Sequence, residues 1–163
     1  MYNKLKYEDF VKAGTIRNLP EIERDDYVKF YEDLWKEDYE ICRDLVEKSP
    51  RWSIISGYYA MHNLAKLFLA KNFRLKINGK FIHAAVIEAL RKCLNNEDIL
   101  KKLEKGKQEC NLEEIPNTIE FAKRERTKSQ YYSRAGTKAN SNKTIYFLKN
   151  IVRPFIETLK KYV

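Results

Sequence analysis

Residues 122–134, "AKRERTKSQYYSR", combine side chains that bind phosphate with side chains that stack on bases. The cationic residues are Lys123, Arg124, Arg126, Lys128 and Arg134, and the tyrosines beside them are Tyr131 and Tyr132. Lysine and arginine neutralise the phosphates of a nucleic acid, and tyrosine rings stack on unpaired bases. This composition is compatible with a surface that binds an RNA backbone, with Arg124 and Arg126 on phosphate. The alternative is a solvated helix end that is merely basic, with one tyrosine turned into the core.

Histidine can exchange protons near neutral pH, and the chain has only two histidines, His62 and His83. His83 lies near the start of a predicted helix, where it is either a residue of the binding cleft or a structural residue hydrogen-bonded to a neighbouring helix. His62 lies within an apolar segment, which favours a structural role.

The sequence gives no pattern for a metal or a cofactor. Cys42, Cys93 and Cys110 are scattered without the paired spacing of a zinc site, and an odd number of cysteines favours reduced thiols. There is no glycine-rich dinucleotide fingerprint, phosphate loop or nucleophile elbow. We therefore predict neither a bound metal nor a cofactor, although magnesium held by carboxylates and substrate oxygens stays open.

Charge is distributed unevenly along the chain. The formal net charge of +9 divides into −4 over residues 1–50 and +13 over residues 51–163. Such asymmetry suggests a surface that faces a polyanion; the alternative is a surface generally rich in lysine and glutamate. The chain has no apolar run long enough to span a bilayer, and its first residues lack the apolar core of a secretory signal, so we expect a cytoplasmic protein.

The hydrophobic pattern predicts an all-α fold with almost no strand. Residues 21–48 have the periodicity of a long amphipathic helix, whereas residues 51–73 are apolar around most of the circumference, as in a helix at the centre of a bundle. Further helices are expected over 81–94, from Asn96 to about Lys107, from a capping box at Asn117 and Glu120 through the basic stretch, and over 144–163 with a kink at Pro154. We treat 1–20 as an N-terminal extension and 21–163 as the bundle.

Two segments resemble the HEPN domain superfamily. The run "GYYAMHNLAKLFLAKNFRLKINGKFIHAAVIEAL" is similar to the central part of these domains, with matches at Tyr58, Tyr59, Ala60, Met61, Ala65, Leu69 and His83. "RTKSQYY" is similar to the Arg-x4-Tyr pattern of the family, through Arg126 and Tyr131.

The resemblance implies an up-and-down bundle of about five to six helices, usually a homodimer, that associates with RNA or nucleotides. Many members are metal-independent ribonucleases of toxin–antitoxin or defence systems, and some are paired with a minimal nucleotidyltransferase. Their catalytic motif is Arg-x4–6-His. This chain has Tyr131 where the motif requires histidine, and no histidine follows His83.

The departure from the motif favours binding over cleavage, because tyrosine with an ordinary pKa near 10 is a poor general base at neutral pH. We therefore expect an HEPN-like protein that binds RNA or a nucleotide in a basic cleft. The expected site consists of Arg126 and Tyr131 as catalytic candidates, with Lys123, Arg124, Lys128, Tyr132, Arg134 and His83 around the phosphate. The alternatives are a metal-independent endoribonuclease with a non-standard motif, a module that binds a nucleotidyltransferase, and a scaffold in which Arg126 pairs with Glu120 or Glu125.

Overall fold

The computed structural model describes residues 4–104, 112–131 and 140–163. The helices and strands in chain order are α1 (Tyr7–Lys12), β1 (Ile16–Asn18), α2 (Glu21–Asp44), α3 (Pro50–Phe73), β2 (Leu75–Ile77), α4 (Ile82–Leu94), α5 (Glu97–Glu104), the 3-10 turn η1 (Leu112–Glu114), α6 (Ile115–Tyr131), α7 (Ser141–Phe147), the π-helical η2 (Leu148–Val152), α8 (Arg153–Leu159) and the 3-10 turn η3 (Lys160–Tyr162). This order confirms the all-α helical bundle predicted from the sequence. None of the described helices is both long and apolar enough to cross a membrane.

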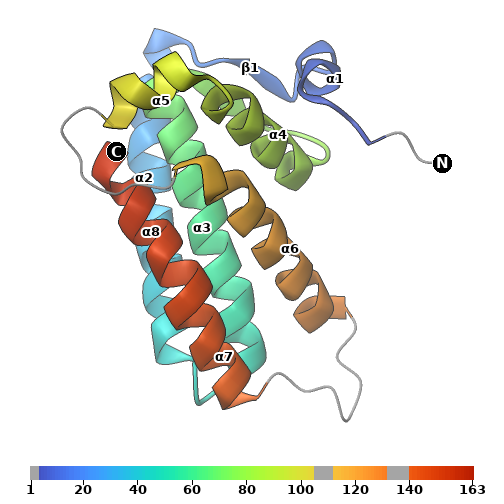
Figure 1. Ribbon diagram of the computed structural model, residues 1–163, viewed down its shortest axis with the longest axis vertical. Helices are drawn as coiled ribbons and strands as arrows, with labels where there is room; N and C mark the ends of the chain where they lie inside the picture. Colours follow the sequence, from blue (N-terminus) through green and yellow to red (C-terminus); the bar gives the residue numbers. More distant parts are fainter. Residues whose placement is uncertain (1–3, 105–111, 132–139) are drawn as a thin grey trace.

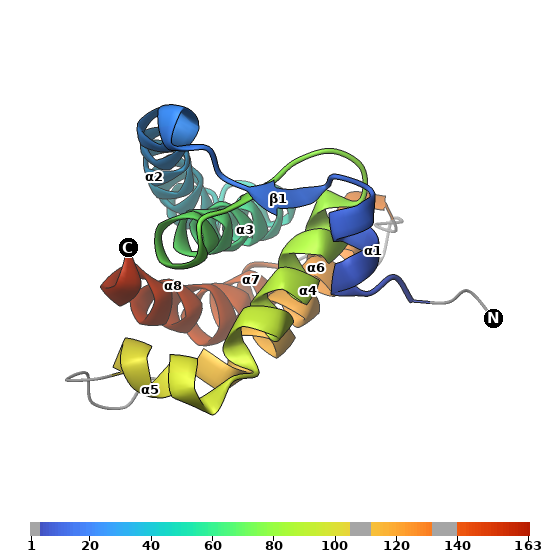
Figure 2. The same cartoon turned by 90° about the horizontal axis from the view of Figure 1, so that it is seen from above.

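Helix α3 is the centre of the bundle, as its apolar circumference predicts. It lies between α2 and the α7–α8 arm, with α6 and α4 against its other side (Figures 1 and 2). Pro50 occupies the first turn of α3, where its missing N–H breaks no helical bond. Gly57 lets the helices approach closely, because a Cβ atom there would lie 2.9 Å from Cys42 Sγ and 3.0 Å from Val152 Cγ2.

The N-terminal residues pack on the outside of the bundle. β1 pairs antiparallel with β2, with Ile16 opposite Ile77 and Asn18 opposite Leu75. Helix α1 lies beside α4 (Figure 2), and Phe10 and Ile16 are buried. The described part of 1–20 is thus joined to the connection between α3 and α4, a pairing that three-residue strands are too short to reveal by alternation.

Helix boundaries depart from the sequence prediction at α2, α6 and α7. Helix α2 ends at Asp44, four residues before the predicted end. Helix α6 begins at Ile115, so Asn117 lies inside the helix and the predicted capping box is wrong. Helix α7 begins at Ser141, three residues before the predicted start, because the Asn140 side chain accepts a 2.8 Å hydrogen bond from the Lys143 backbone N–H.

The irregularity expected at Pro154 takes the form of η2. A proline cannot donate the backbone bond of an α-helix, and its ring clashes with the carbonyl four residues earlier. The wider turn of η2 directly precedes Pro154, and the Arg153 N–H donates to the Leu148 carbonyl, five residues back. The last arm thus remains continuous from α7 to α8.

Candidate functional site

Helix α6 divides the basic stretch between opposite faces. Successive residues of an α-helix are about 100° apart, so Arg126 turns inward and is only 6% exposed, whereas Tyr131 is 67% exposed. The outward stripe, which we call the outer face of α6, consists of Phe121, Arg124, Lys128 and Tyr131. The structure therefore does not bring Arg126 and Tyr131 together. Two further predicted site residues, Tyr132 and Arg134, lie outside the described residues.

Arg126 is held by aromatic rings and one amide. Its guanidinium carbon lies 5.2 Å from the ring centroid of Tyr58 and 5.7 Å from that of Tyr59, both on α3. Nη1 donates a 2.7 Å hydrogen bond to Oε1 of Gln130, one turn further along α6. Nε is buried and has no hydrogen-bond partner among the described residues. Cation–π contacts stabilise such a charge without neutralising it.

The carboxylates nearest in sequence are occupied by other cations. Glu120 pairs with Arg91 and more distantly with Arg124, at 3.8 Å. Glu125 pairs with Lys128 at 2.8 Å and with Lys143 at 3.3 Å. No described carboxylate lies within ion-pair distance of Arg126, so the scaffold pairing of Arg126 with Glu120 or Glu125 does not occur. Within the described residues, Arg126 is a buried cation without an anion.

The fold also brings His83 close to Arg126, because both side chains contact Tyr58. Tyr58 has its hydroxyl 2.8 Å from Nδ1 of His83, at hydrogen-bonding distance, and also lies under the Arg126 guanidinium. Burial, and then the charges of Arg126 and Lys123, lower the pKa of His83 to about 4. Burial is also the main reason that the pKa of Tyr58 is raised. At neutral pH the imidazole is therefore uncharged and the phenol keeps its proton.

A buried polar stripe on α3 escaped the sequence analysis. Tyr58, His62 and Lys66 follow one another at four-residue steps and are almost completely buried. The His62 and His83 ring centroids are 4.6 Å apart, and His62 Nε2 has no hydrogen-bond partner in the described part of the chain. Burial, with the charges of His83, Lys66 and Arg126, lowers the pKa of His62 well below its usual value. The sequence signal that could have revealed this stripe is the four-residue spacing of Tyr58, His62 and Lys66 within a largely apolar helix.

Lys66 continues the stripe toward α2. Its Nζ donates to the Tyr31 hydroxyl and lies 4.1 Å from the centroid of that ring. Burial, and to a lesser degree the charge of Lys76, lowers the pKa of Lys66 to about 8. No described carboxylate forms an ion pair with it. Lys66 is thus a second buried cationic group in addition to Arg126, and basic side chains outnumber acidic ones among the buried residues that the structure describes.

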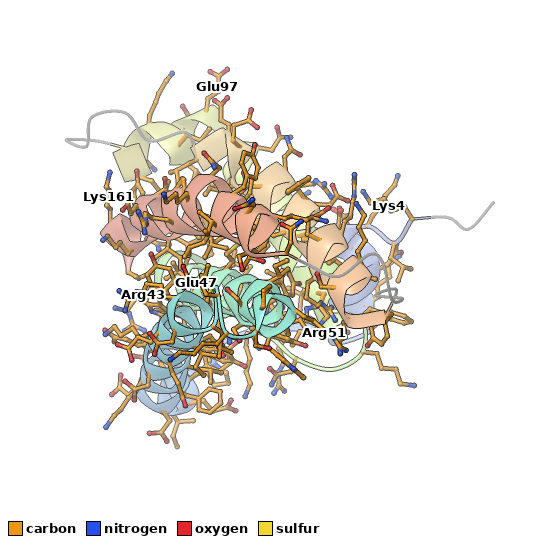
Figure 3. The ribbon with its side chains drawn as sticks, turned by 90° about the horizontal axis from the view of Figure 1, so that it is seen from below. Lys4, Arg43, Glu47, Arg51, Glu97 and Lys161 are labelled. Carbon is orange, nitrogen blue, oxygen red and sulfur yellow. The ribbon has the colours of Figure 1, made fainter. Side chains whose placement is uncertain are left out.

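Cationic side chains lie at the edge of the Arg126 site. Lys123 is half-buried, and burial, followed by the charge of Arg126, lowers its pKa. Arg51 Nη2 donates a 3.0 Å hydrogen bond to the backbone carbonyl of Gln130, which joins the start of α3 to the end of α6. Figure 3 shows Arg51 beside the last turn of α6. We call Arg126, His83, Tyr58, Tyr59 and Lys123 together the inner cluster.

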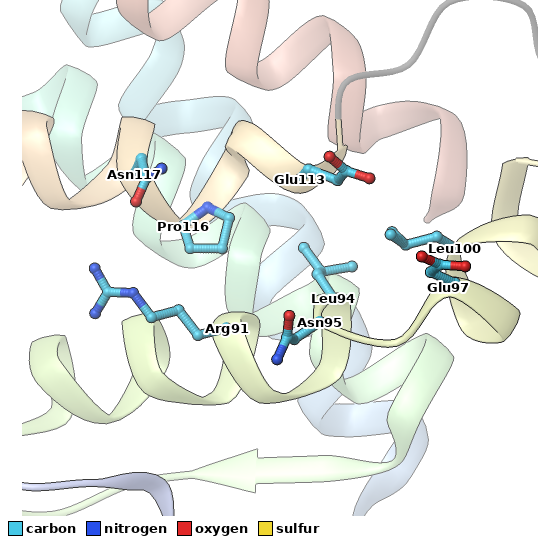
Figure 4. A pocket seen from close by; sticks show the side chains of 8 residues that line it. All are labelled: Arg91, Leu94, Asn95, Glu97, Leu100, Glu113, Pro116 and Asn117. Carbon is cyan, nitrogen blue, oxygen red and sulfur yellow. The ribbon is translucent and has the colours of Figure 1, made fainter.

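A hollow lies elsewhere, between α4, α5 and α6 (Figure 4). It has a volume of about 550 Å³ and includes the carboxylates of Glu97 and Glu113. Neither Arg126 nor His83 lines it. Acidic groups in its wall make it a poorer place for a phosphate than the inner cluster.

What the inner cluster can do follows from its groups. Arg126 supplies a forked donor suited to phosphate, Lys123 a second cation, and His83 a neutral imidazole. Within the described ranges, no group of three or more His, Cys, Asp or Glu side chains is placed to hold a metal ion.

Comparison with protein-family models, curated proteins and solved structures finds no match to the chain. Function must therefore be inferred from the residues and their geometry.

Proposed function

We propose that this chain binds the phosphate groups of RNA or of a nucleotide, with Arg126 at the base of the site. The observation that carries the proposal is a buried guanidinium whose partners are two tyrosine rings and one amide, with no carboxylate of the described chain paired to it. Desolvating an unpaired charge is expensive, and an anionic ligand would supply the missing counter-charge. Lys123 stands at the edge of the site, and Arg124 and Lys128 add positive potential from the outer face of α6.

The resemblance to HEPN domains supports the same ligand class, because Arg126 belongs to the matched motif. From that resemblance we also propose a homodimer and a role in a toxin–antitoxin or defence system, with a minimal nucleotidyltransferase as a candidate partner. Measurement of the molar mass in solution tests the homodimer. Co-purification with the product of a neighbouring gene tests the nucleotidyltransferase.

Binding of a short unstructured RNA at several salt concentrations tests the main proposal. We expect the logarithm of the affinity to fall linearly with the logarithm of salt concentration, because bound phosphates release counterions. Arg126→Ala should weaken binding at least about tenfold, since a buried charge-assisted contact is worth about 1.5–3 kcal/mol. Lys29→Ala is the matched control, because it removes an exposed cation from α2 on another part of the surface.

Two results would contradict the proposal. One is the absence of RNA and nucleotide binding by the native chain even at low salt. The other is equal weakening by Arg126→Ala and Lys29→Ala, which would mean that only net charge matters.

A second candidate function is metal-independent RNA cleavage with His83 as the base. The favouring observation is that His83 and Arg126 both contact Tyr58, whereas Tyr131 is exposed on another face. A neutral imidazole can accept the proton of a 2′-hydroxyl as that oxygen bonds to phosphorus, while Arg126 stabilises the charge on the phosphate; the 5′-oxygen of the next nucleotide leaves and takes a proton from water. Incubation with RNA in excess chelator tests it: cleavage should be lost in His83→Gln and kept in Tyr131→Phe. Intact RNA at high protein concentration would exclude it.

A further inference from the structure

An exposed aromatic ring stands at the start of α4, two residues before His83. Phe81 is 69% exposed, and its backbone is in the left-handed region, with φ 56° and ψ 29°. Its carbonyl accepts the first hydrogen bonds of α4, from the N–H groups of Ala84 and Ala85. Phe81 is therefore the N-cap residue of α4.

Phenylalanine is unfavourable at this position for two independent reasons. A side chain with a Cβ in the left-handed region destabilises the fold, and a bulky residue there is an outlier that calls for an explanation. The N-cap position favours Ser, Thr, Asp or Asn, whose side chains accept a helical N–H, and Phe81 makes no such bond. Because the ring is largely in solvent, its burial offsets little of the stability lost through the left-handed backbone and the missing cap bond. Such strain is typical of residues held for a ligand.

The surroundings of Phe81 indicate which ligand. A small hollow of about 150 Å³ is lined by Phe81, by the apolar residues Leu5, Ala84 and Ile87, and by Lys123. Lys80 is exposed next to Phe81 in the chain. The carboxylates of this hollow, Glu88 and Glu120, are both bonded to Arg91. An apolar ring beside Lys80 and Lys123, neither of which forms an ion pair with a described carboxylate, suits a base attached to a phosphate.

We propose that Phe81 is a stacking platform for an unpaired base of an RNA strand whose phosphate is held by Lys123 and Arg126. The inference rests on the proposed function and adds the part of the ligand next to the phosphate. Lys123 connects the two places, because it lines the hollow with Phe81 and its pKa is affected by the charge of Arg126. Stacking on a ring tolerates any base, so the site takes single-stranded RNA without strong sequence preference.

The test compares fluorescence anisotropy of a labelled oligouridine with that of an abasic strand of equal length and charge. We expect Phe81→Ala to weaken binding of the oligouridine about fivefold or more, as loss of one base–aromatic stack does. Binding of the abasic strand should not change, because it has phosphates and no base. Phe81→Trp should bind the oligouridine at least as tightly as the native chain. Phe30→Ala, which removes an exposed aromatic ring from α2, should leave both affinities unchanged.

Phe81→Gly separates binding from folding. Glycine adopts a positive φ without steric penalty, so this variant should melt at or above the native temperature while it loses the oligouridine as Phe81→Ala does. A parallel loss of stability and affinity in both variants would mean that the ring supports the fold, and would overturn the proposal.

The remaining outcomes separate the two proposals. If the native chain binds no RNA, both are overturned. If it binds RNA and Phe81→Ala binds the oligouridine equally well, only the stacking platform is overturned. Adenosine monophosphate as competitor distinguishes a free nucleotide from a strand: displacement at concentrations near the RNA affinity would overturn the assignment to RNA.

Discussion

The two faces of α6 place the same kinds of residue in opposite environments. On the outer face, the side chains of Arg124 and Lys128 are 68% and 64% exposed. In the inner cluster, Arg126 is 6% exposed and rests on Tyr58 and Tyr59. An exposed charge in water is screened by salt and stabilises little, whereas a buried one interacts strongly with whatever lies nearby. Arginines two residues apart in the chain therefore differ in what they can do.

This difference suggests a division of labour in anion binding. If the chain binds RNA as proposed, the outer face would attract the polyanion from a distance and contribute affinity that depends on salt. The inner cluster, where Arg126 is buried against two rings, would favour one orientation of one phosphate. Variants on the two faces should therefore change different observables.

The largest effect is expected when Arg126 is replaced by methionine. The buried charge disappears while the volume is nearly kept, so the variant should lose RNA affinity at least about tenfold but gain about 1 kcal/mol of stability, the desolvation penalty exceeding the lost cation–π contacts. Thermal melting should show an increase of about 2–4 °C for a chain of this size. A clear loss of stability would mean that Arg126 has a structural role. It would then contradict the proposed difference in anion binding between the inner cluster and the outer face of α6.

The next effect concerns pH. The pKa of His83 is about 4 in the folded chain, depressed from 6.5 by burial and then by Arg126 and Lys123, so the unfolded chain binds more protons between these values. Stability should therefore fall by about 2 kcal/mol from pH 7 to pH 5 through this group alone. Denaturant unfolding of the native chain and of His83→Gln measures it. An equal pH dependence in both would contradict the burial of His83.

A smaller effect is expected on the outer face. Arg124→Ala should reduce the slope of log affinity against log salt by about one and weaken RNA binding a few-fold. Stability should change by less than about 0.5 kcal/mol, because the Arg124–Glu120 pair is exposed on the arginine side and long, at 3.8 Å. A steep drop in affinity with an unchanged slope would place Arg124 in a specific phosphate contact instead.

The smallest effect is expected at Tyr131. The ring is 67% exposed on a different face from Arg126, so Tyr131→Phe should change stability by less than about 0.5 kcal/mol and leave any RNA cleavage intact. Gel analysis of RNA after incubation with each protein measures this. Loss of cleavage in Tyr131→Phe would support the catalytic role predicted from the Arg-x4-Tyr pattern.

The helical architecture could be predicted from the sequence because a long periodic pattern of apolar residues indicates directly which face of a helix is buried. The all-round apolar pattern of 51–73 identified the central helix, and Pro154 marked the irregular turn of the last arm. The boundaries were less accurate, since a cap depends on one side-chain bond. Asn140 makes such a bond, whereas Asn117 lies within a helix.

The candidate site was predicted only in part. Composition identified Arg126 and Lys123, and a lone histidine suggested His83, but composition does not say which way a side chain turns. The helical angle between Arg126 and Tyr131 already argued against their meeting. The apolar segment 51–73 already favoured a structural role for His62, whereas the contacts of His62 and Lys66 and the left-handed backbone of Phe81 depend on tertiary packing and leave no mark in local propensity.

The pairing of β1 with β2 fixes the route of the chain into α4. The Leu19 N–H donates to the Arg74 carbonyl and the Asn78 N–H to the Thr15 carbonyl, so the connection is clamped before and after β2. Phe81 and His83 follow within a few residues, and a clamped connection loses less entropy when a ligand binds. If the chain binds an anion as proposed, detaching the β1–β2 ribbon should weaken that binding without removing any residue that contacts the anion.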